Sequence, residues 1–304
     1  MPLYIPYIKN ETSESCPDLK GQEYRASFHT HSFARGPRKK IYHGHLEGMG
    51  PRKGEHAVVK VFRDSPGTEE MCDVEISKHS LGRRLARKFN KLIPNQQYKI
   101  NFTLPLKSTV ERLGVGCYLT RHKSRHLDLK EWVLIEENLT LENKFQVFIR
   151  KTGERLSDEP TTLDAFLHFS YHESGGKFVL CGFQGIQTEN GYLLTTPWIH
   201  WADTNLWSSS DNGLAKIRQV FGFHQCNNIC YKFIRPVEDS TEEIEQSNND
   251  KENNEANQKL DTGIDEQHMV DVMESNMCEN KQRDATHLLK SNSNEKDDLT
   301  EHNK

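Results

Sequence analysis

Every one of the 27 aromatic residues lies before position 236 of this 304-residue chain. Residues 236–304 carry 19 acidic against 7 basic side chains, a net charge of −12. A segment with no aromatic residue and so high a net charge cannot bury enough apolar surface to offset its chain entropy. We therefore expect a disordered acidic tail over 236–304, and the chain must fold within the residues that precede it.

Residues 1–235 carry 33 basic and 25 acidic side chains, a net charge of +8. This length suits a compact two-lobed domain, which we place at 25–235 after an irregular lead at 1–24. No apolar run approaches the ~18 residues of a membrane-spanning helix, and the start MPLYIPYIKN has no signal-peptide pattern. We expect a cytoplasmic protein with no membrane partner. The odd count of seven cysteines favours free thiols or a metal site over disulfides.

Hydrophobic periodicity predicts the elements of this domain. Two strands are expected at 41–47 and 57–62, and Lys60 shares a strand face with Val58 and Phe62. Leu81, Leu85, Phe89 and Leu92 recur at helical spacing within a helix at 73–92. Further strands are expected at 98–104, 117–121, 132–135, 145–150 and 178–180, and further helices at 162–171 and 214–221. This order indicates an α+β fold with a β-rich N-terminal lobe and a mixed C-terminal lobe, and a cleft between such lobes is a usual ligand site.

The second face of the helix at 73–92 is basic. It carries Lys78, Arg83, Arg84, Arg87, Lys88 and Lys91. Because no exposed aromatic residues accompany these charges, we interpret the face as solvated, or as a docking surface for an acidic protein or the acidic tail, and expect no nucleic-acid partner.

A metal-ligating pattern stands near the end of the folded part. His224, Cys226 and Cys230 lie within seven residues, and the i, i+4 spacing of the two cysteines would place them on one helix face. A structural zinc ion needs four ligands, and the spacing does not identify the fourth, for which His168 and His172 are candidates. Two buried thiols beside a surface histidine explain this pattern equally well.

Several segments taken together resemble one known family. They are Phe33-Ala34-Arg35-Gly36 before the paired strands, Ala57-Val58-Val59-Lys60, "FLHFSYHESGGKFVLCGFQG", "LLTTPWIH" and "SDNGLAKIRQVFGFHQCNNIC". Over about residues 25–233 the chain resembles the alpha-kinases, which are atypical serine/threonine protein kinases. The resemblance implies a two-lobed alpha-kinase-like domain that binds ATP and a structural zinc ion.

The resemblance also implies roles for individual residues. Lys60 matches the strand lysine that contacts the ATP phosphates, a role that suits a cation fixed on a rigid strand; without the resemblance, a surface-seeking lysine would be the better interpretation. Arg38 or Lys39 resembles the basic residue that follows the F-A-x-G loop. Glu136 to Leu139 resembles the hinge that reads adenine. The zinc ligands implied are His168, His224, Cys226 and Cys230.

The sequence departs from the family in its catalytic segment. The family has D-L-Q-G, whose Asp serves as catalytic base or orients the substrate hydroxyl, and T-D-P ten residues later, whose Asp holds magnesium together with the Gln. Here Gln184 is present, but Gly182 and Thr196 replace the two aspartates. Magnesium favours carboxylate oxygen, so magnesium binding is the least supported cofactor prediction. Four other carboxylates could substitute: Glu173, Glu189, Asp203 and Asp211.

Three functions therefore stay open from the sequence. The first is an ATP-dependent protein serine/threonine kinase. The second is a pseudokinase, a catalytically dead binding or scaffold module that still holds nucleotide through Lys60 and Gln184. The third is a zinc-stabilised interaction domain without nucleotide. Because a fold does not fix a function, the two replaced aspartates favour the second over the first for chemistry, and the protein substrate or partner is not identified.

Overall fold

The computed structural model describes residues 8–94, 98–115, 125–141, 144–159, 161–203 and 213–237. The segment from Met1 to Pro236 forms one compact unit. The strand predicted at 117–121, the candidate carboxylate Asp211 and almost all of the predicted acidic tail lie outside the described residues.

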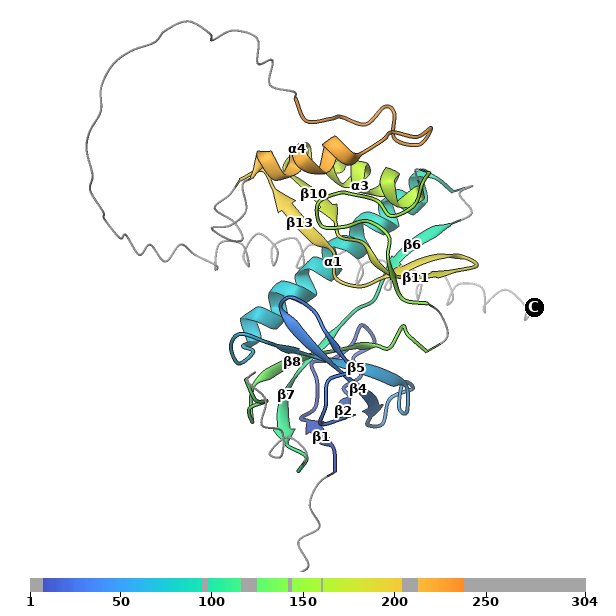
Figure 1. Ribbon diagram of the computed structural model, residues 1–304. Coiled ribbons are helices and arrows are strands. Elements are labelled where there is room, and N and C mark those ends of the chain that lie inside the picture. Colours follow the sequence, from blue (N-terminus) through green and yellow to red (C-terminus); the bar gives the residue numbers. More distant parts are fainter. Residues whose placement is uncertain are drawn as a thin grey trace, which may run out of the picture. The chain divides into compact units, whose positions relative to one another are not determined.

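A seven-stranded antiparallel sheet forms the N-terminal lobe (Figure 1). Its strands are β1 (Asn10–Thr12), β2 (Arg25–Phe28), β3 (Ala34–Arg35), β4 (Lys39–Glu47), β5 (His56–Phe62), β7 (Leu106–Arg112) and β8 (Trp132–Glu137). The strand order is β2-β1-β7-β8-β5-β4-β3, and β2 also pairs with β4, so six of the strands close into a ring. Closure removes the exposed edges that would otherwise invite pairing with another chain.

The two faces of this ring have different roles because strand side chains alternate. Val59 and Val61 of β5 point into a buried core together with residues such as Phe28 and Leu106. Lys60 lies between them in sequence and therefore points to the outer face. It stands opposite Ile41 of β4 in the strand register. The alternation of β5 thus fixes which face of the sheet presents the lysine.

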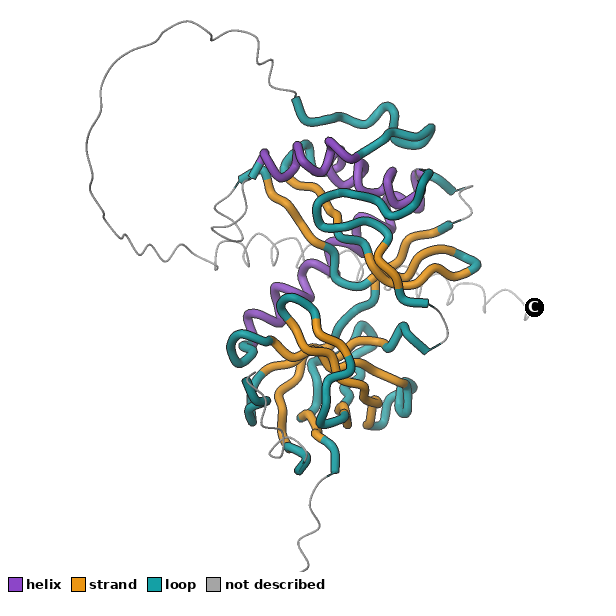
Figure 2. The backbone as a smooth tube through the Cα atoms, viewed as in Figure 1, coloured by secondary structure: helices purple, strands orange, loops and turns teal. Residues whose placement is uncertain are grey.

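The C-terminal lobe combines helices with two smaller sheets. A four-stranded sheet has the order β6-β12-β11-β9, and β10 pairs antiparallel with β13. The strands are β6 (Lys99–Phe102), β9 (Gln146–Val147), β10 (Phe178–Cys181), β11 (Gln184–Thr188), β12 (Gly191–Leu194) and β13 (Trp198–Trp201), and the helices are α3 (Thr162–Glu173) and α4 (Leu214–Phe223). Their core is rich in aromatic rings, including Phe166 and Phe183. Figure 2 shows α3 and α4 gathered in this lobe.

Helix α1 (Glu69–Leu92) belongs to both lobes (Figure 1). Near its start Cys72 packs with Phe62 and Leu134 of the N-terminal sheet. Near its end the ring of Phe89 lies 5.4 Å from that of Phe166 in α3. One rigid element therefore contacts the sheet that carries Lys60 and the core that supports β11.

The sequence predicted the α+β class and the helices, and the structure confirms both. The side chains of Thr161 and Asp164 form a capping box at the start of α3. Helix α1 begins four residues earlier than predicted, because the Thr68 side chain caps it. The irregular lead predicted at 1–24 is wrong over Asn10–Thr12, which forms β1. Its polar residues give no strand signal, but the Asn10 amide bonds to the backbone of His29 and Gly114. No described helix is long and apolar enough to span a membrane.

Candidate functional site

A cavity of about 140 Å³ opens where the outer face of the N-terminal sheet meets α1 and the segment from β11 to β13. Its lining comes from both lobes and from distant parts of the sequence. The lining residues are Gly36, Pro37, Arg38, Lys39, Ile41, Lys60, Glu75, Lys78, Gln184, Thr195, Thr196, Pro197 and Trp198. Five residues singled out from the sequence, Arg38, Lys39, Lys60, Gln184 and Thr196, therefore surround one cavity, and their roles stay predictions.

Lys60 is held by a buried carboxylate. Its Nζ lies 2.6 Å from Oε1 of Glu136, whose side chain is 1% exposed. Burial opposes the charge on Glu136, but the charge of Lys60 and its hydrogen bond outweigh it and hold the pKa of Glu136 below its usual value. The segment from Glu136 to Leu139 was predicted to be the hinge that reads adenine, and this role stays a prediction; the Glu136 side chain itself pairs with Lys60. Leu139, the other end of that predicted hinge, is buried just beyond β8.

Among the described residues, Glu75 of α1 is the one carboxylate that lines the cavity, and it was not predicted from the sequence. It forms ion pairs with Lys39 of β4 and with Lys78, the latter at 2.9 Å. Burial opposes its charge, but these two lysines hold the pKa of Glu75 well below its usual value. Burial also lowers the pKa of Lys39. Of the two basic residues proposed after the F-A-x-G loop, Lys39 is partly buried, and Arg38 lies exposed at the rim.

A second residue missed in the sequence, His79, binds Thr196. The Nε2 atom of His79 lies 2.6 Å from the Thr196 hydroxyl, and its Nδ1 lies 2.9 Å from the carbonyl oxygen of Thr103. A carbonyl only accepts, so Nδ1–H donates to Thr103 and the Thr196 hydroxyl donates to Nε2. Burial lowers the pKa of His79 to about 4, which keeps the ring neutral. The hydroxyl that replaces an expected aspartate is therefore oriented by a buried histidine.

A sequence signal for Glu75 and His79 did exist. They lie four residues apart on α1, in line with Cys72, Gly82 and Phe89, all of which are buried. A polar side chain that recurs at helical spacing within a buried stripe must find a partner. The stripe predicted from the sequence, Leu81, Leu85, Phe89 and Leu92, took account of apolar residues only; its first three members are buried, and Leu92 is 55% exposed.

The space beside Gly182 is filled by an indole. Gly182 has φ +64°, and a Cβ added there would lie 2.4 Å from Cδ1 of Trp198. Trp198 lies on β13, lines the cavity and has the Lys151 ammonium 5.3 Å from the centre of its ring. The Trp198 indole therefore occupies the place where a side chain at position 182 would begin.

Of the alternative carboxylates proposed from the sequence, none of the three described ones lines the cavity. Glu173 forms an ion pair with Lys88, on the surface between α3 and α1. Glu189 lies in the turn between β11 and β12, and Asp203 follows β13.

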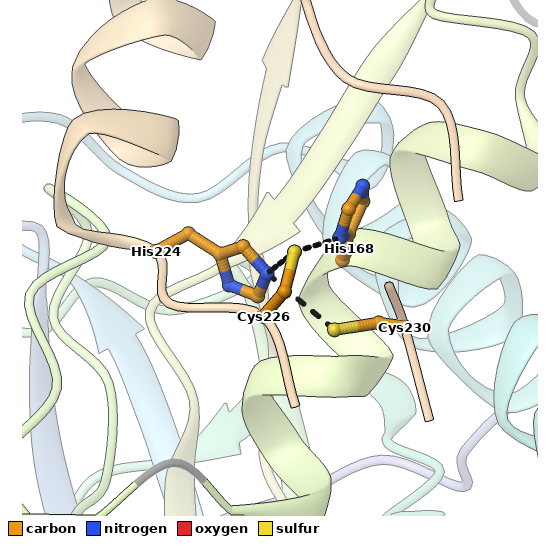
Figure 3. Close-up of side chains that lie close together, drawn as sticks. All are labelled: His168, His224, Cys226 and Cys230. Carbon is orange, nitrogen blue, oxygen red and sulfur yellow. Dashed lines mark hydrogen bonds between the residues drawn. The ribbon is translucent and has the colours of Figure 1, made fainter. Parts of the chain in front are cut away.

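A metal-ligating cluster lies in the C-terminal lobe, and it joins the four residues that the family resemblance implied (Figure 3). The ligand atoms of His168, His224, Cys226 and Cys230 all lie within 4.8 Å of one another. Three sulfur–nitrogen pairs, Cys226 with each histidine and Cys230 with His224, are each separated by 3.6 Å. The Nε2–H of His168 donates to the carbonyl oxygen of Ile234 at 2.8 Å, which leaves its Nδ1 free to face the cluster.

The cysteine pair reaches the cluster in a different way from the one predicted. Helix α4 ends at Phe223, so Cys226 and Cys230 are not on a helix face. They lie in the turns that follow, where the Asn227 carboxamide oxygen accepts from the backbone N–H of Ile229. Loop geometry, not i, i+4 spacing, brings the thiols together with His168 of α3.

A closed antiparallel N-terminal lobe, a mixed C-terminal lobe and a strand lysine over the cavity between them define a two-lobed kinase-like domain. The alpha-kinase family model matches residues 34–230. The chain therefore belongs to the alpha-kinase family.

Relatives agree with this membership. Alpha-protein kinase 1 from Dictyostelium discoideum is 27% identical over 201 residues, which are 66% of this chain and 13% of that protein. Alpha-protein kinase vwkA from the same organism is 41% identical over 70 residues, 23% of this chain and 11% of that protein. The chain thus spans only a small part of the length of these relatives.

Solved structures share the fold. The alpha-kinase domain of myosin heavy chain kinase A in complex with AMP has a TM-score of 0.56 at 18% identity, covering 73% of this chain and 97% of that one. An inactive variant of the same domain in complex with ATP has a TM-score of 0.55 at 19% identity, covering 73% and 96%.

Proposed function

We propose that this domain binds ATP in the cavity at Lys60 and transfers its phosphate poorly or not at all, so that it acts as a nucleotide-binding interaction module. The observation that carries this proposal is the charge arrangement. Lys60, Lys39, Lys78 and Arg38 line the cavity, whereas Gly182 and Thr196 supply no carboxylate. Cations aimed into a cleft offset phosphate charge, but phosphoryl transfer also needs the hydroxyl to be oriented and the metal to be held.

Complexes of a relative support the view that ATP binding does not require phosphate transfer. Two inactive variants of the myosin heavy chain kinase A domain, each with one aspartate replaced by alanine, form complexes with ATP. By analogy, the replaced aspartates of this chain are compatible with nucleotide binding. The alternative, an active serine/threonine kinase, would need a free carboxylate at the cavity, and Glu75 is already paired with two lysines.

The test removes the buried ion pair as a unit. Truncating Lys60 alone would strand the Glu136 charge and destabilise the fold, so the variant is Lys60→Met with Glu136→Gln. Hydrogen bonds to charged groups contribute about 1.5–3 kcal/mol, so we expect ATP affinity to fall by roughly ten- to a hundredfold. Thermal shift against ATP concentration measures this fall. Lys177→Ala, in an exposed turn, is the control.

A phosphate-transfer assay separates the two enzymatic alternatives. With ATP, magnesium and a general protein substrate, we expect no phosphate incorporation above that of the Lys60→Met/Glu136→Gln variant. Incorporation by the natural chain that this variant loses would favour the kinase. Unchanged ATP binding in the variant would remove the nucleotide role of the cavity.

We also infer that the cluster of His168, His224, Cys226 and Cys230 binds zinc. With Zn–S of about 2.3 Å and Zn–N of about 2.05 Å in tetrahedral geometry, the sulfur–nitrogen separation would be roughly 3.6 Å. The three measured separations of 3.6 Å agree with this value. A closed site of four protein ligands serves structure and not catalysis.

A further inference from the structure

Magnesium does not fit the residues that surround this cavity. It prefers carboxylate oxygen in near-octahedral geometry. At the three positions where the family segment would orient substrate or hold metal, this chain offers Gly182, the neutral amide of Gln184 and the neutral hydroxyl of Thr196. The Thr196 hydroxyl is also oriented by its 2.6 Å hydrogen bond to His79.

The carboxylates near the cavity are already neutralised by lysines. Glu75 pairs with Lys39 and Lys78, and Glu136 pairs with Lys60. These partners leave the two side chains 6% and 1% exposed. A divalent cation would have to displace ammonium groups from buried positions to reach either carboxylate, and would meet like charge there.

The net charge of the site favours an anion. Arg38, Lys39, Lys60 and Lys78 line the cavity, and Glu75 and Glu136 offset two of these four charges. The residual charge of +2 is the charge that one magnesium ion would bring. Fixed cations can therefore take the place of the metal in neutralising phosphate oxygens.

We propose that the cavity binds the polyphosphate of a nucleotide as the metal-free anion, and that Glu75 is an internal competitor that occupies Lys39 and Lys78 until the phosphate arrives. This inference rests on the proposed nucleotide binding and adds the ionic form of the ligand. Magnesium then weakens binding, because it lowers the negative charge of the ligand and contributes no contact to the protein. Removal of the Glu75 charge strengthens binding, because two lysines are released to the phosphate.

Isothermal titration of the folded chain tests both statements. ATP is titrated in buffer freed of divalent ions by a resin, with and without millimolar magnesium chloride; a soluble chelator is avoided because it would also strip the histidine–cysteine cluster. We expect magnesium to weaken ATP binding by severalfold. An affinity that is unchanged or stronger with magnesium would overturn the proposal.

Two variants should change the ATP affinity in opposite directions, whereas structural damage would weaken binding in both. Glu75→Gln should strengthen metal-free ATP binding about tenfold, the order expected for one charge a few ångström away, and Lys78→Gln should weaken it by severalfold. Weaker binding in Glu75→Gln, with its magnesium effect lost, would show that Glu75 holds metal. Glu173→Gln, which removes a paired carboxylate away from the cavity, should leave affinity unchanged. Circular dichroism checks that each variant is folded.

Inorganic tripolyphosphate separates this inference from the proposed function. If metal-free tripolyphosphate binds and ATP does not, the nucleotide function fails while the metal-free anion site stands. If ATP binds only with magnesium, the nucleotide function stands and this inference fails. If neither ligand binds under either condition, both fail.

Discussion

At the scale of single residues, the catalytic segment differs from its family by more than two missing side chains. Gly182 has a positive φ, and the Trp198 indole fills the volume where a side chain at 182 would begin. The sequence showed the loss of the aspartate, because Gln184 and Gly185, which follow it, keep the family pattern. It could not show the tryptophan contact, because Trp198 is sixteen positions away and reaches Gly182 only through the β10–β13 pairing.

Gly182→Asp should therefore destabilise the domain. Left-handed backbone and steric strain at one residue cost about 1–3 kcal/mol, and the added Cβ would stand 2.4 Å from the indole. In a double-mutant cycle with Trp198→Ala, we expect the cost of Gly182→Asp to fall by about 1 kcal/mol or more. Urea unfolding of the four proteins measures this coupling, and additive costs would mean that the indole moves aside freely. Restoring the aspartate alone is thus a poor way to restore transfer.

At the scale of elements, α1 determines how the cavity is built. One face of this helix carries Glu75 and His79 inward, so a single rigid element supplies the lysine counter-ion and the Thr196 partner. The apolar periodicity of the helix could be predicted, and so could its approximate length. The partners of its buried polar residues could not be predicted. Thr103 and Thr196 lie 24 and 117 residues from His79 in the sequence, and no local pattern specifies such contacts.

The buried His79 predicts an acid-sensitive stability. Its pKa is about 4 in the folded protein against 6.5 for an ordinary histidine. Between these values the unfolded chain binds more protons, so the stability that the neutral ring contributes is complete above pH 6.5 and is lost as the pH falls toward 4. The full effect is roughly 3 kcal/mol.

His79→Gln should remove this part of the acid dependence. The variant loses some stability near neutral pH, because its amide replaces the histidine hydrogen bonds imperfectly. The difference between the natural chain and the variant should then narrow as the pH is lowered from neutral toward 4. Unfolding free energies across this range test the prediction, and two parallel curves would show that His79 is not the titrating group. The histidines of the metal cluster are common to both proteins, so their contribution cancels.

At the scale of the whole molecule, two features organise the domain: the closed antiparallel ring and the metal-ligating cluster. The short strands β1, β2 and β3 help to close or extend the ring. They could not be predicted, because runs of two to four residues are too short to show alternation. The four cluster residues could be identified only through the family resemblance. Spacing alone identified three of them and assigned the cysteines to a helix that ends before them. Residues that are far apart in the sequence and meet only in the folded chain are the ones that local patterns miss.

Zinc should join the last turns of the domain to α3, and Cys226 tests this most sharply because it is the exposed member of the cluster. If Cys226 were only a surface thiol, Cys226→Ser would change stability by less than about 0.5 kcal/mol. As a zinc ligand its loss should cost several times more, because metal binding contributes directly to folding. We expect about one zinc per chain by elemental analysis, and a fall in both zinc content and melting temperature in Cys226→Ser. Cys16→Ser, a partly exposed thiol outside the cluster, should keep its zinc. A Cys226→Ser variant as stable as the natural chain, or a natural chain folded without metal, would reduce the cluster to a group of buried thiols and histidines.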